Sequence, residues 1–316
     1  MKEYGGYIEL DNFNGSEYYS EAVLLNCGRS CLTYLIKAKK IRKLYIPYFL
    51  CDTVKMCCEA YDVEYFYYNI TTEFKPVLSA ANEDDYVYVV NFYGFLSDDY
   101  IYELKDKYKN LILDNSQAFF RKPLIGIDTI YVCRKFFGVA DGAYLYTDKI
   151  IDEKIEDDYC YDRMIFLLGR YEKKASEFYE DYVNNNKYFD KLLFKGCSKI
   201  SKNILKAIDY EKVKNVRTEN YKRLVSLLSN INELCVSDIE GAFAYPLLIE
   251  DGLRIKRELI KERIYIPTLW DDVFGLCSEE TIEHKYAANI LPLPVDQRYS
   301  VEDMEYIAGR IVRVMV

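Results

Sequence analysis

Short apolar runs alternate with amphipathic stretches through the first 115 residues of the chain. Apolar runs of strand length lie at residues 22–25, 43–47, 63–67, 85–92 and 110–114. Apolar positions at helical spacing lie between several of these runs, at residues 31–38, 53–61 and 98–108. Buried strands that alternate with helices are typical of a doubly wound, mostly parallel sheet. We therefore expect an α/β fold with a mostly parallel central sheet flanked by helices.

The pattern changes further along the chain. Two short β-like segments, residues 127–132 and 143–147, flank a loop that contains glycines, and we expect them to pair. Charged helical spacing follows in residues 152–187. The remaining expected elements are helices at residues 204–228, 253–263 and 301–315 and strands at residues 241–249, 265–267 and 290–295.

This change of pattern predicts three parts. Residues 1–20 are polar and aromatic and are expected to form an N-terminal arm. Residues 21–202 are expected to form a large domain, and residues 203–316 a smaller C-terminal α+β domain. The chain of 316 residues, half of them hydrophobic, is long enough to bury a sizeable core.

Composition excludes several classes of function. The net charge is −9 and no basic stripe is present, so nucleic acid is not an expected partner. No apolar run reaches membrane-spanning length, so no membrane association is expected. The ten cysteines form no CxxC pair, and His284 is the only histidine, which argues against metal sites and against histidine-based triads. The first residues lack a signal-peptide core, so we expect reduced thiols and a cytoplasmic location.

An acid and a lysine stand out near the middle of the chain. Asp114 ends the buried run LILD, and Gln117 follows three residues later. Lys135 precedes Phe136 and Phe137, whose apolar surroundings would lower its pKa and make the amine nucleophilic. An acid that can hold a ring nitrogen and a lysine that can form a Schiff base are what a pyridoxal phosphate (PLP) enzyme requires. Taken singly, the acid is more typical of a helix cap and the lysine of a surface charge.

The turn before the first expected helix is a candidate anion site. Gly28, Arg29 and Ser30 stand where free backbone N–H groups and the helix dipole favour a bound anion. The alternative is that Ser30 only caps the helix and Arg29 is solvated. Because ligands of parallel sheets bind beyond the carboxyl ends of strands, we expect this turn to converge with residues 48–51, 91–94 and 114–117.

Six segments in a fixed order then resemble one family over nearly the whole chain. They are LNCGRSCL (25–32), VVNFYG (89–94), LDNSQA (113–118), RKFFGVADGAYLYT (134–147), RTENYKRL (217–224) and LPLPVDQRYSVEDMEYI (291–307). Together they are similar to the DegT/DnrJ/StrS family of sugar aminotransferases, which are PLP-dependent transferases of fold type I.

The resemblance implies a cofactor, a reaction and a set of site residues. Lys135 would carry PLP as a Schiff base and move a proton, and Asp114 would hold the pyridinium. An amino acid, commonly glutamate, would donate an amino group to a keto-sugar, usually linked to a nucleotide. The family forms homodimers with the site at the subunit interface. The other residues expected at the cofactor are Gln117 at the ring hydroxyl, Gly28, Arg29 and Ser30 at the phosphate, Phe49 or its neighbour Tyr48 on the ring, Asn91 and Cys133.

The sequence also departs from the family pattern. Asn91 stands where the family usually has a histidine, and Tyr131-Val132-Cys133 offers no phosphate-binding serine before the lysine. The loop lent by the partner subunit has no clear register, and residues 184–186 are candidates for it because they are three asparagines. Two alternatives therefore stay open: a member with impaired catalysis that serves as a binding or regulatory module, and an aminotransferase with a non-sugar acceptor.

Overall fold

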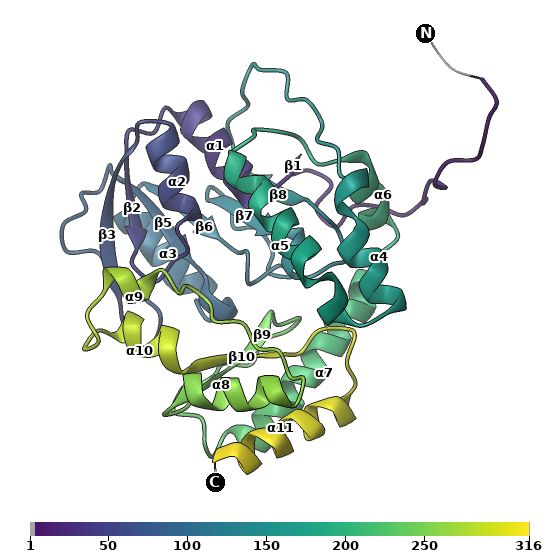
Figure 1. The fold of residues 1–316 in the computed structure, drawn as a ribbon. Coiled ribbons are helices and arrows are strands. Elements are labelled where there is room, and N and C mark those ends of the chain that lie inside the picture. Colours follow the sequence, from purple (N-terminus) through teal and green to yellow (C-terminus); the bar gives the residue numbers. More distant parts are fainter. Residues whose placement is uncertain (1–3, 316) are drawn as a thin grey trace.

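The computed structural model describes residues 4–315, and its largest element is a sheet of eight strands in the order β1-β8-β7-β6-β5-β2-β3-β4 (Figure 1). The strands are β1 (Val23–Leu25), β2 (Lys43–Pro47), β3 (Glu64–Ile70), β4 (Pro76–Val77), β5 (Tyr86–Val90), β6 (Asn110–Asp114), β7 (Asp128–Val132) and β8 (Ala143–Tyr146).

Six of these strands run in the same direction. The neighbours β3, β2, β5, β6 and β7 are parallel to one another. Strand β8 is antiparallel to both β7 and β1, so β1 runs in the same direction as β7. The mostly parallel sheet expected from the sequence is therefore confirmed. Its consequence is that the loops after β1, β2, β5, β6 and β7 all leave from the same edge.

Helices cover this sheet. The helices of this part are α1 (Gly28–Lys39), α2 (Thr53–Ala60), α3 (Asp98–Lys107), α4 (Ile165–Glu172), α5 (Tyr179–Tyr188) and α6 (Lys199–Lys206). Helix α1 packs on β7, β8 and α2, while α3 packs on β6. Short 3₁₀ turns follow the strand ends and helices at Phe92–Gly94, Cys133–Lys135, Tyr161–Arg163, Ala175–Phe178 and Phe189–Lys191.

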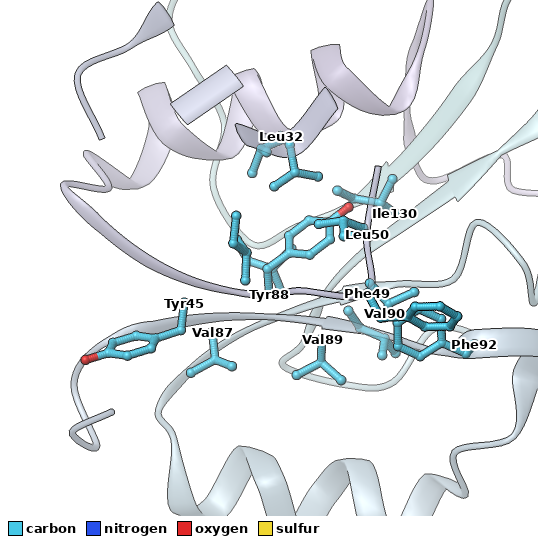
Figure 2. Close-up of a cluster of buried hydrophobic side chains, with 14 of the residues drawn as sticks. Leu32, Tyr45, Phe49, Leu50, Val87, Tyr88, Val89, Val90, Phe92 and Ile130 are labelled. Atoms are coloured by element: carbon cyan, nitrogen blue, oxygen red, sulfur yellow. The ribbon is translucent and has the colours of Figure 1, made fainter. Parts of the chain in front are cut away.

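The central strand β5 shows why the sheet forms where it does. Its sequence YVYVV is apolar and β-branched or aromatic throughout, which suits a strand buried on both faces. In Figure 2, Tyr88 points toward Leu32 of α1, while Val87 and Val89 point to the opposite side of the strand. All four side chains are buried, and each stabilises the fold by about 1.5–3 kcal/mol through the apolar surface removed from water.

The C-terminal part has its own small sheet and core. Strands β9 (Ala244–Leu248) and β10 (Ile290–Pro294) pair antiparallel and lie against α7 (Tyr210–Leu228), α8 (Gly252–Lys261) and α11 (Val301–Met315) (Figure 1). Two further helices, α9 (Val273–Leu276) and α10 (Ile282–Asn289), lie beside β3 instead (Figure 1). The predicted division at residue 202 stays a prediction, because α6 crosses it and Val273 and Tyr286 join the core of the larger sheet.

Several sequence expectations differ from the structure. The single helix expected over residues 204–228 is two helices, because the chain turns at Ala207–Asp209 and the Asp209 carboxylate accepts the Lys212 N–H at 3.0 Å as a new N-cap. The strand expected at residues 265–267 is irregular, and only parts of residues 152–187 are helical. The expected arm includes residues 1–3, which lie outside the described residues, while residues 4–17 form no helix or strand. None of the helices in residues 4–315 is both long and apolar enough to cross a membrane.

Candidate active site

Three sequence-predicted groups meet at the carboxyl edge of the sheet. Gly28 begins α1 directly after β1, Asp114 is the last residue of β6, and Lys135 ends the turn that follows β7. These strands run in the same direction, so the three groups share one edge. A Cβ on Gly28 would lie 3.1 Å from Cγ2 of Val132, so glycine lets the start of α1 approach β7 closely. The turn before α1 and the end of β6 therefore lie at the edge that the strand pattern predicted, and their contact with one ligand stays a prediction.

Asp114 is a buried carboxylate that accepts hydrogen bonds from two neutral donors. Its Oδ2 accepts the Tyr88 hydroxyl at 2.8 Å, and its Oδ1 accepts the Ser116 N–H at 2.7 Å. Burial, followed by the charge of Asp114, raises the pKa of Tyr88 well above its usual value, so the phenol keeps its proton and donates. Among residues 4–315, no lysine or arginine nitrogen lies within 4.0 Å of this carboxylate, which is 7% exposed. A buried carboxylate without a cation is costly, and a cationic ligand would relieve that cost.

Lys135 lies on the other side of Ser116. Its Nζ donates to Ser116 Oγ at 2.8 Å and lies 5.8 Å from the centre of the Phe243 ring. The side chain is exposed, and within the described part of the chain no carboxylate oxygen lies within 4.0 Å of it. Ser116 therefore joins the two groups, because its backbone N–H binds Asp114 and its hydroxyl binds Lys135. The amine and the carboxylate share Ser116 as a neighbour but do not pair directly.

One arginine, Arg29, lies in the first turn of α1, and a second, Arg134, lies in the turn after β7. Cys27 is the N-cap, and its side chain makes no capping hydrogen bond to the first turn. Arg29 pairs with Asp190 at 3.0 Å. Arg134 lies over the Phe189 ring at 4.5 Å, and, counting only residues 4–315, no carboxylate lies within salt-bridge distance of it. Burial lowers the pKa of Arg134, and nearby Arg29 lowers it further, yet a guanidinium stays protonated in proteins. A helix N-terminus with an unpaired arginine suits an anionic group.

The side chains of two residues expected at the cofactor, Ser30 and Cys133, point into the fold. The hydroxyl of Ser30 is buried and lies 2.6 Å from Asn26 Oδ1. The thiol of Cys133 is fully buried, and a Cβ on Gly142 would lie 3.3 Å from its sulfur. Arg134, which was not among the predicted site residues, has no carboxylate partner in residues 4–315 and is better placed for an anion than either group.

Three further predicted residues support the loops around the site. Gln117 is buried, and its Oε1 accepts the Tyr93 N–H at 2.8 Å. The Asn91 amide donates to Asn115 Oδ1 at 3.0 Å and accepts the Leu96 N–H at 3.0 Å. These contacts tie the loop after β5 to the loop after β6, so both amides hold the loops in register. Their contact with a cofactor stays a prediction.

The two aromatic candidates after β2 are both engaged with other rings. Phe49 is fully buried with its ring 4.3 Å from that of Trp270, and Figure 2 shows it beside Val90 and Phe92. The Tyr48 ring stacks on that of Tyr67 at 4.6 Å. These contacts tie the loop after β2 to the rest of the fold, and a stacking role for either ring on a cofactor stays a prediction.

The asparagines of α5 contact the lysine loop of their own chain. Asn185 is buried and donates to the Ala140 carbonyl at 3.0 Å, and Asn186 accepts a hydrogen bond from Arg134. Asn184 is exposed. Helix α5 thus contacts both the turn that carries Lys135 and the loop that follows it.

Three residues of the site were missed by the sequence reasoning. Ser116 was inside the quoted DNSQ segment, but only the side-chain geometry shows that its hydroxyl meets Lys135. Tyr88 could be found only from strand register, because Val90 pairs with Asp114 and Tyr88 lies two residues earlier on the same face. Arg134 could have been found from the sequence, because it is the residue directly before Lys135. Within residues 4–315, no group of three or more histidine, cysteine, aspartate or glutamate side chains could hold a metal ion.

The fold of this chain is similar to that of several solved aminotransferases. The sequence matches no protein-family model and no curated protein, whereas solved structures match it over most of its length. One is a DegT/DnrJ/EryC1/StrS aminotransferase from Brucella abortus, at 13% identity and a TM-score of 0.64, covering 93% of this chain and 85% of that one.

Two other similar structures contain a cofactor form or were solved with a product. NtdA from Bacillus subtilis, with bound cofactor PMP, is 13% identical with a TM-score of 0.63, covering 93% of this chain and 73% of that one. DesI, solved in the presence of its TDP-sugar product, is 13% identical with a TM-score of 0.63, covering 93% of this chain and 80% of that one. At these identities the similarity establishes the fold.

Proposed function

We propose that this protein is a PLP-dependent aminotransferase that moves an amino group from an amino acid to a keto-sugar. The observation that carries the proposal is a pair of complementary unpaired charges. The buried carboxylate of Asp114 has no cation beside it, and the cations of Lys135 and Arg134 have no carboxylate. PLP has a ring nitrogen that binds a proton and a phosphate with up to two negative charges, so it complements both ends.

The residues present fit this cofactor in defined roles. Asp114, held by Tyr88 and Ser116, would bind the protonated ring nitrogen. The N–H groups at the start of α1 and the guanidinium of Arg134 would bind the phosphate. Lys135 Nζ would bind the cofactor covalently and, once displaced by the amino donor, take the proton from the donor's Cα as a base. When bound, PLP supplies an electron sink for the electron pair of that C–H bond.

The proposed reaction is balanced without any other reactant. The amino donor, glutamate in the first instance, becomes a keto acid, and the carbonyl of the keto-sugar becomes an amine. The likeness to DesI, which was solved with its TDP-sugar product, supports a nucleotide-linked acceptor. The exposure of Lys135 in the single chain supports a homodimer whose partner covers the site. The ten free thiols support a reducing, cytoplasmic location.

The test is whether Lys135 forms a Schiff base. Purified protein mixed with PLP should develop the visible absorption of a lysine-bound cofactor. Borohydride should then fix the adduct, and peptide mapping by mass spectrometry should place it on Lys135. Lys135→Ala should abolish the band, whereas Lys149→Ala, which changes an exposed lysine after β8, should leave it unchanged. A Lys135→Ala protein that keeps the band and the activity would contradict the proposal.

A binding or regulatory module is the second candidate. It is favoured by the engagement of Gln117, Asn91 and Phe49 in the fold, since their side chains are buried against other protein groups. The two candidates differ in turnover. If glutamate removes the lysine-bound absorption and yields its keto acid, the aminotransferase is supported. A stable adduct that no amino acid converts would favour the module.

A further inference from the structure

A buried arginine joins the C-terminal part of the chain to the lysine loop. Arg217 lies on α7, is 2% exposed, and opens the segment RTENYKRL. Its Nη2 donates to the Phe136 carbonyl at 3.2 Å, and its Nη1 donates to the Ala242 carbonyl at 3.0 Å. Its Nε donates to Gln297 Oε1 at 2.9 Å. Each nitrogen of the guanidinium therefore has an acceptor, and one of these acceptors belongs to the residue after Lys135.

Gln297 reaches the same carbonyl from a second segment. It follows β10 in the stretch LPLPVDQ, and its Nε2 donates to the Phe136 carbonyl at 2.8 Å. The Phe136 oxygen thus accepts two hydrogen bonds from the C-terminal part of the chain, and the two donors bind each other. The Arg217 guanidinium also lies 4.6 Å from the centre of the Phe136 ring. Both the backbone and the side chain of Phe136 are held.

The same guanidinium holds the ring beside the lysine amine. Arg217 Nη1 lies 3.4 Å from the Phe243 carbonyl, and the Phe243 ring is the one that lies 5.8 Å from Lys135 Nζ. Lys135 is therefore bordered by two residues that Arg217 binds: Phe136 next to it in sequence and Phe243 next to its amine. Ser116, on the opposite side, accepts the hydrogen bond of that amine.

Burying the charge of the Arg217 guanidinium is costly, and no ion pair in the described part of the chain offsets that cost. Among residues 4–315, no carboxylate lies within 4.0 Å of Arg217, and the carboxylate of Asp296 is engaged by Arg298 through bonds of 2.6 and 2.7 Å. Burial lowers the pKa of Arg217 to about 10, which leaves it charged at neutral pH. A helix that only needed an anchor could use an apolar side chain here. The Arg217 guanidinium instead donates to the carbonyl oxygens of Phe136 and Ala242, and these hydrogen bonds fix the position of the backbone at both residues.

We propose that Arg217, together with Gln297, is a positioning residue that fixes the backbone after Lys135 so that its amine faces Ser116 and the cofactor. This inference rests on the proposed function, in which Lys135 is the cofactor-binding lysine. It gives a role to segments 217–224 and 291–307, for which no contact with the cofactor was expected. It also makes the lysine dependent on the position of the C-terminal part.

The experiment compares Arg217→Lys and Gln297→Leu with the wild type in the full-length protein. Arg223→Lys is the matched control, because Arg223 lies on the same helix but pairs with Glu305 at the surface. The first measurement is the rate at which the lysine-bound absorption appears after mixing with PLP. We expect this rate to fall on the order of tenfold in both variants, since a small misplacement of a reacting group costs at least that much. Arg223→Lys should match the wild type, and circular dichroism should show that all variants are folded.

The second measurement does not need PLP. Trace labelling with an amine-reactive reagent over a range of pH, read by mass spectrometry, reports the reactivity of Lys135 relative to exposed Lys149 in the same sample. We expect the ratio to change at least threefold in Arg217→Lys and Gln297→Leu but not in Arg223→Lys. A merely structural loss of stability would not change the ratio at temperatures where the protein is folded.

The outcomes separate this inference from the proposed function. If the wild type forms no adduct with PLP, the proposed function fails, and the labelling ratio alone decides whether Arg217 and Gln297 position Lys135. If the wild type forms the adduct and both variants match it in rate and in labelling, the positioning role is refuted while the proposed function stands. Slower adduct formation together with altered labelling supports both.

Discussion

Replacing Asp114 by asparagine tests the central argument about charge. The carboxylate accepts one hydrogen bond from Tyr88 and one from the Ser116 N–H. An asparagine of the same shape can accept from the Ser116 N–H with its oxygen and donate to the Tyr88 hydroxyl with its amide nitrogen, because a hydroxyl can accept as well as donate. The substitution therefore keeps both hydrogen bonds and removes only the charge.

The magnitude differs between the cofactor-free and the cofactor-bound protein. Without cofactor, two charge-assisted hydrogen bonds become neutral, which loses about 1–2 kcal/mol in total. The desolvation of an unpaired buried charge, worth several kcal/mol, is relieved at the same time, so the free energy of unfolding should stay equal or rise. With cofactor, one partner of a buried charge pair is lost. That should weaken PLP binding by about 2–5 kcal/mol, or roughly 30-fold to 5,000-fold.

The assay pairs PLP titration with unfolding of the cofactor-free protein. Tyr88→Phe is the comparison, because it keeps the charge and removes one donor, which should lower the free energy of unfolding by about 1–3 kcal/mol. Tyr88→Phe should thus lower the stability of the cofactor-free protein, whereas Asp114→Asn should leave it equal or raise it. An Asp114→Asn protein that binds PLP as tightly as the wild type would refute the reasoning. So would one that is destabilised as strongly as Tyr88→Phe.

Three other outcomes follow from the structure. Cys235 is the exposed thiol of the ten, so a thiol reagent should modify it first and should modify the buried thiols only on unfolding, as counted by mass spectrometry. Burial raises the pKa of both Cys57 and Cys58 to about 12. Their contribution to stability is therefore fully present below about pH 8.5 and is lost as the pH rises toward 12. Replacing both by alanine should make the free energy of unfolding decrease less steeply with pH in this alkaline range. A Cβ on Gly252 would lie 2.6 Å from a backbone atom of α10, so Gly252→Ala should lower the free energy of unfolding, measured by thermal denaturation, by about 1–3 kcal/mol. Gly309 has open space around it inside α11, so Gly309→Ala should raise the same free energy by about 0.5–1 kcal/mol.

The pattern of apolar residues was sufficient for the large sheet because its strands are buried on both faces. The bounds expected for β2 and β6 match the structure, as does the helix at Val301–Met315. The pattern failed where local chemistry competes with periodicity. The break at Ala207–Asp209 depends on one N-capping carboxylate, which a continuous apolar stripe hides. The short helix α10 has too few apolar positions to show a helical pattern in the sequence. Its place is fixed by contacts with β3 and β9, which are far away in the sequence.

The site was predictable as far as it depends on strand ends. Asp114, Lys135 and Gly28 follow strands that run in the same direction, so their convergence follows from the strand pattern. The direction in which a side chain points does not follow from the strand pattern. Whether the Ser30 hydroxyl faces an anion or Asn26 depends on where the helix starts, and it starts three residues earlier than the periodicity suggested. The contact between Ser116 and Lys135 depends on how the loops after β6 and β7 lie relative to each other, and the spacing of residues in the sequence does not predict this.

Ser116 also explains why two opposite charges so close together stay apart. The simplest way to stabilise the fold would be a direct ion pair between Asp114 and Lys135, which would offset the desolvation of both. The structure instead places one serine between them, with its N–H on the acid and its hydroxyl on the amine. Folding alone gains little from this arrangement, because each charge is left with neutral partners. A ligand with a cationic ring at one end and a carbonyl carbon within reach of the amine gains from both charges at once, so the separation of the pair favours binding over stability.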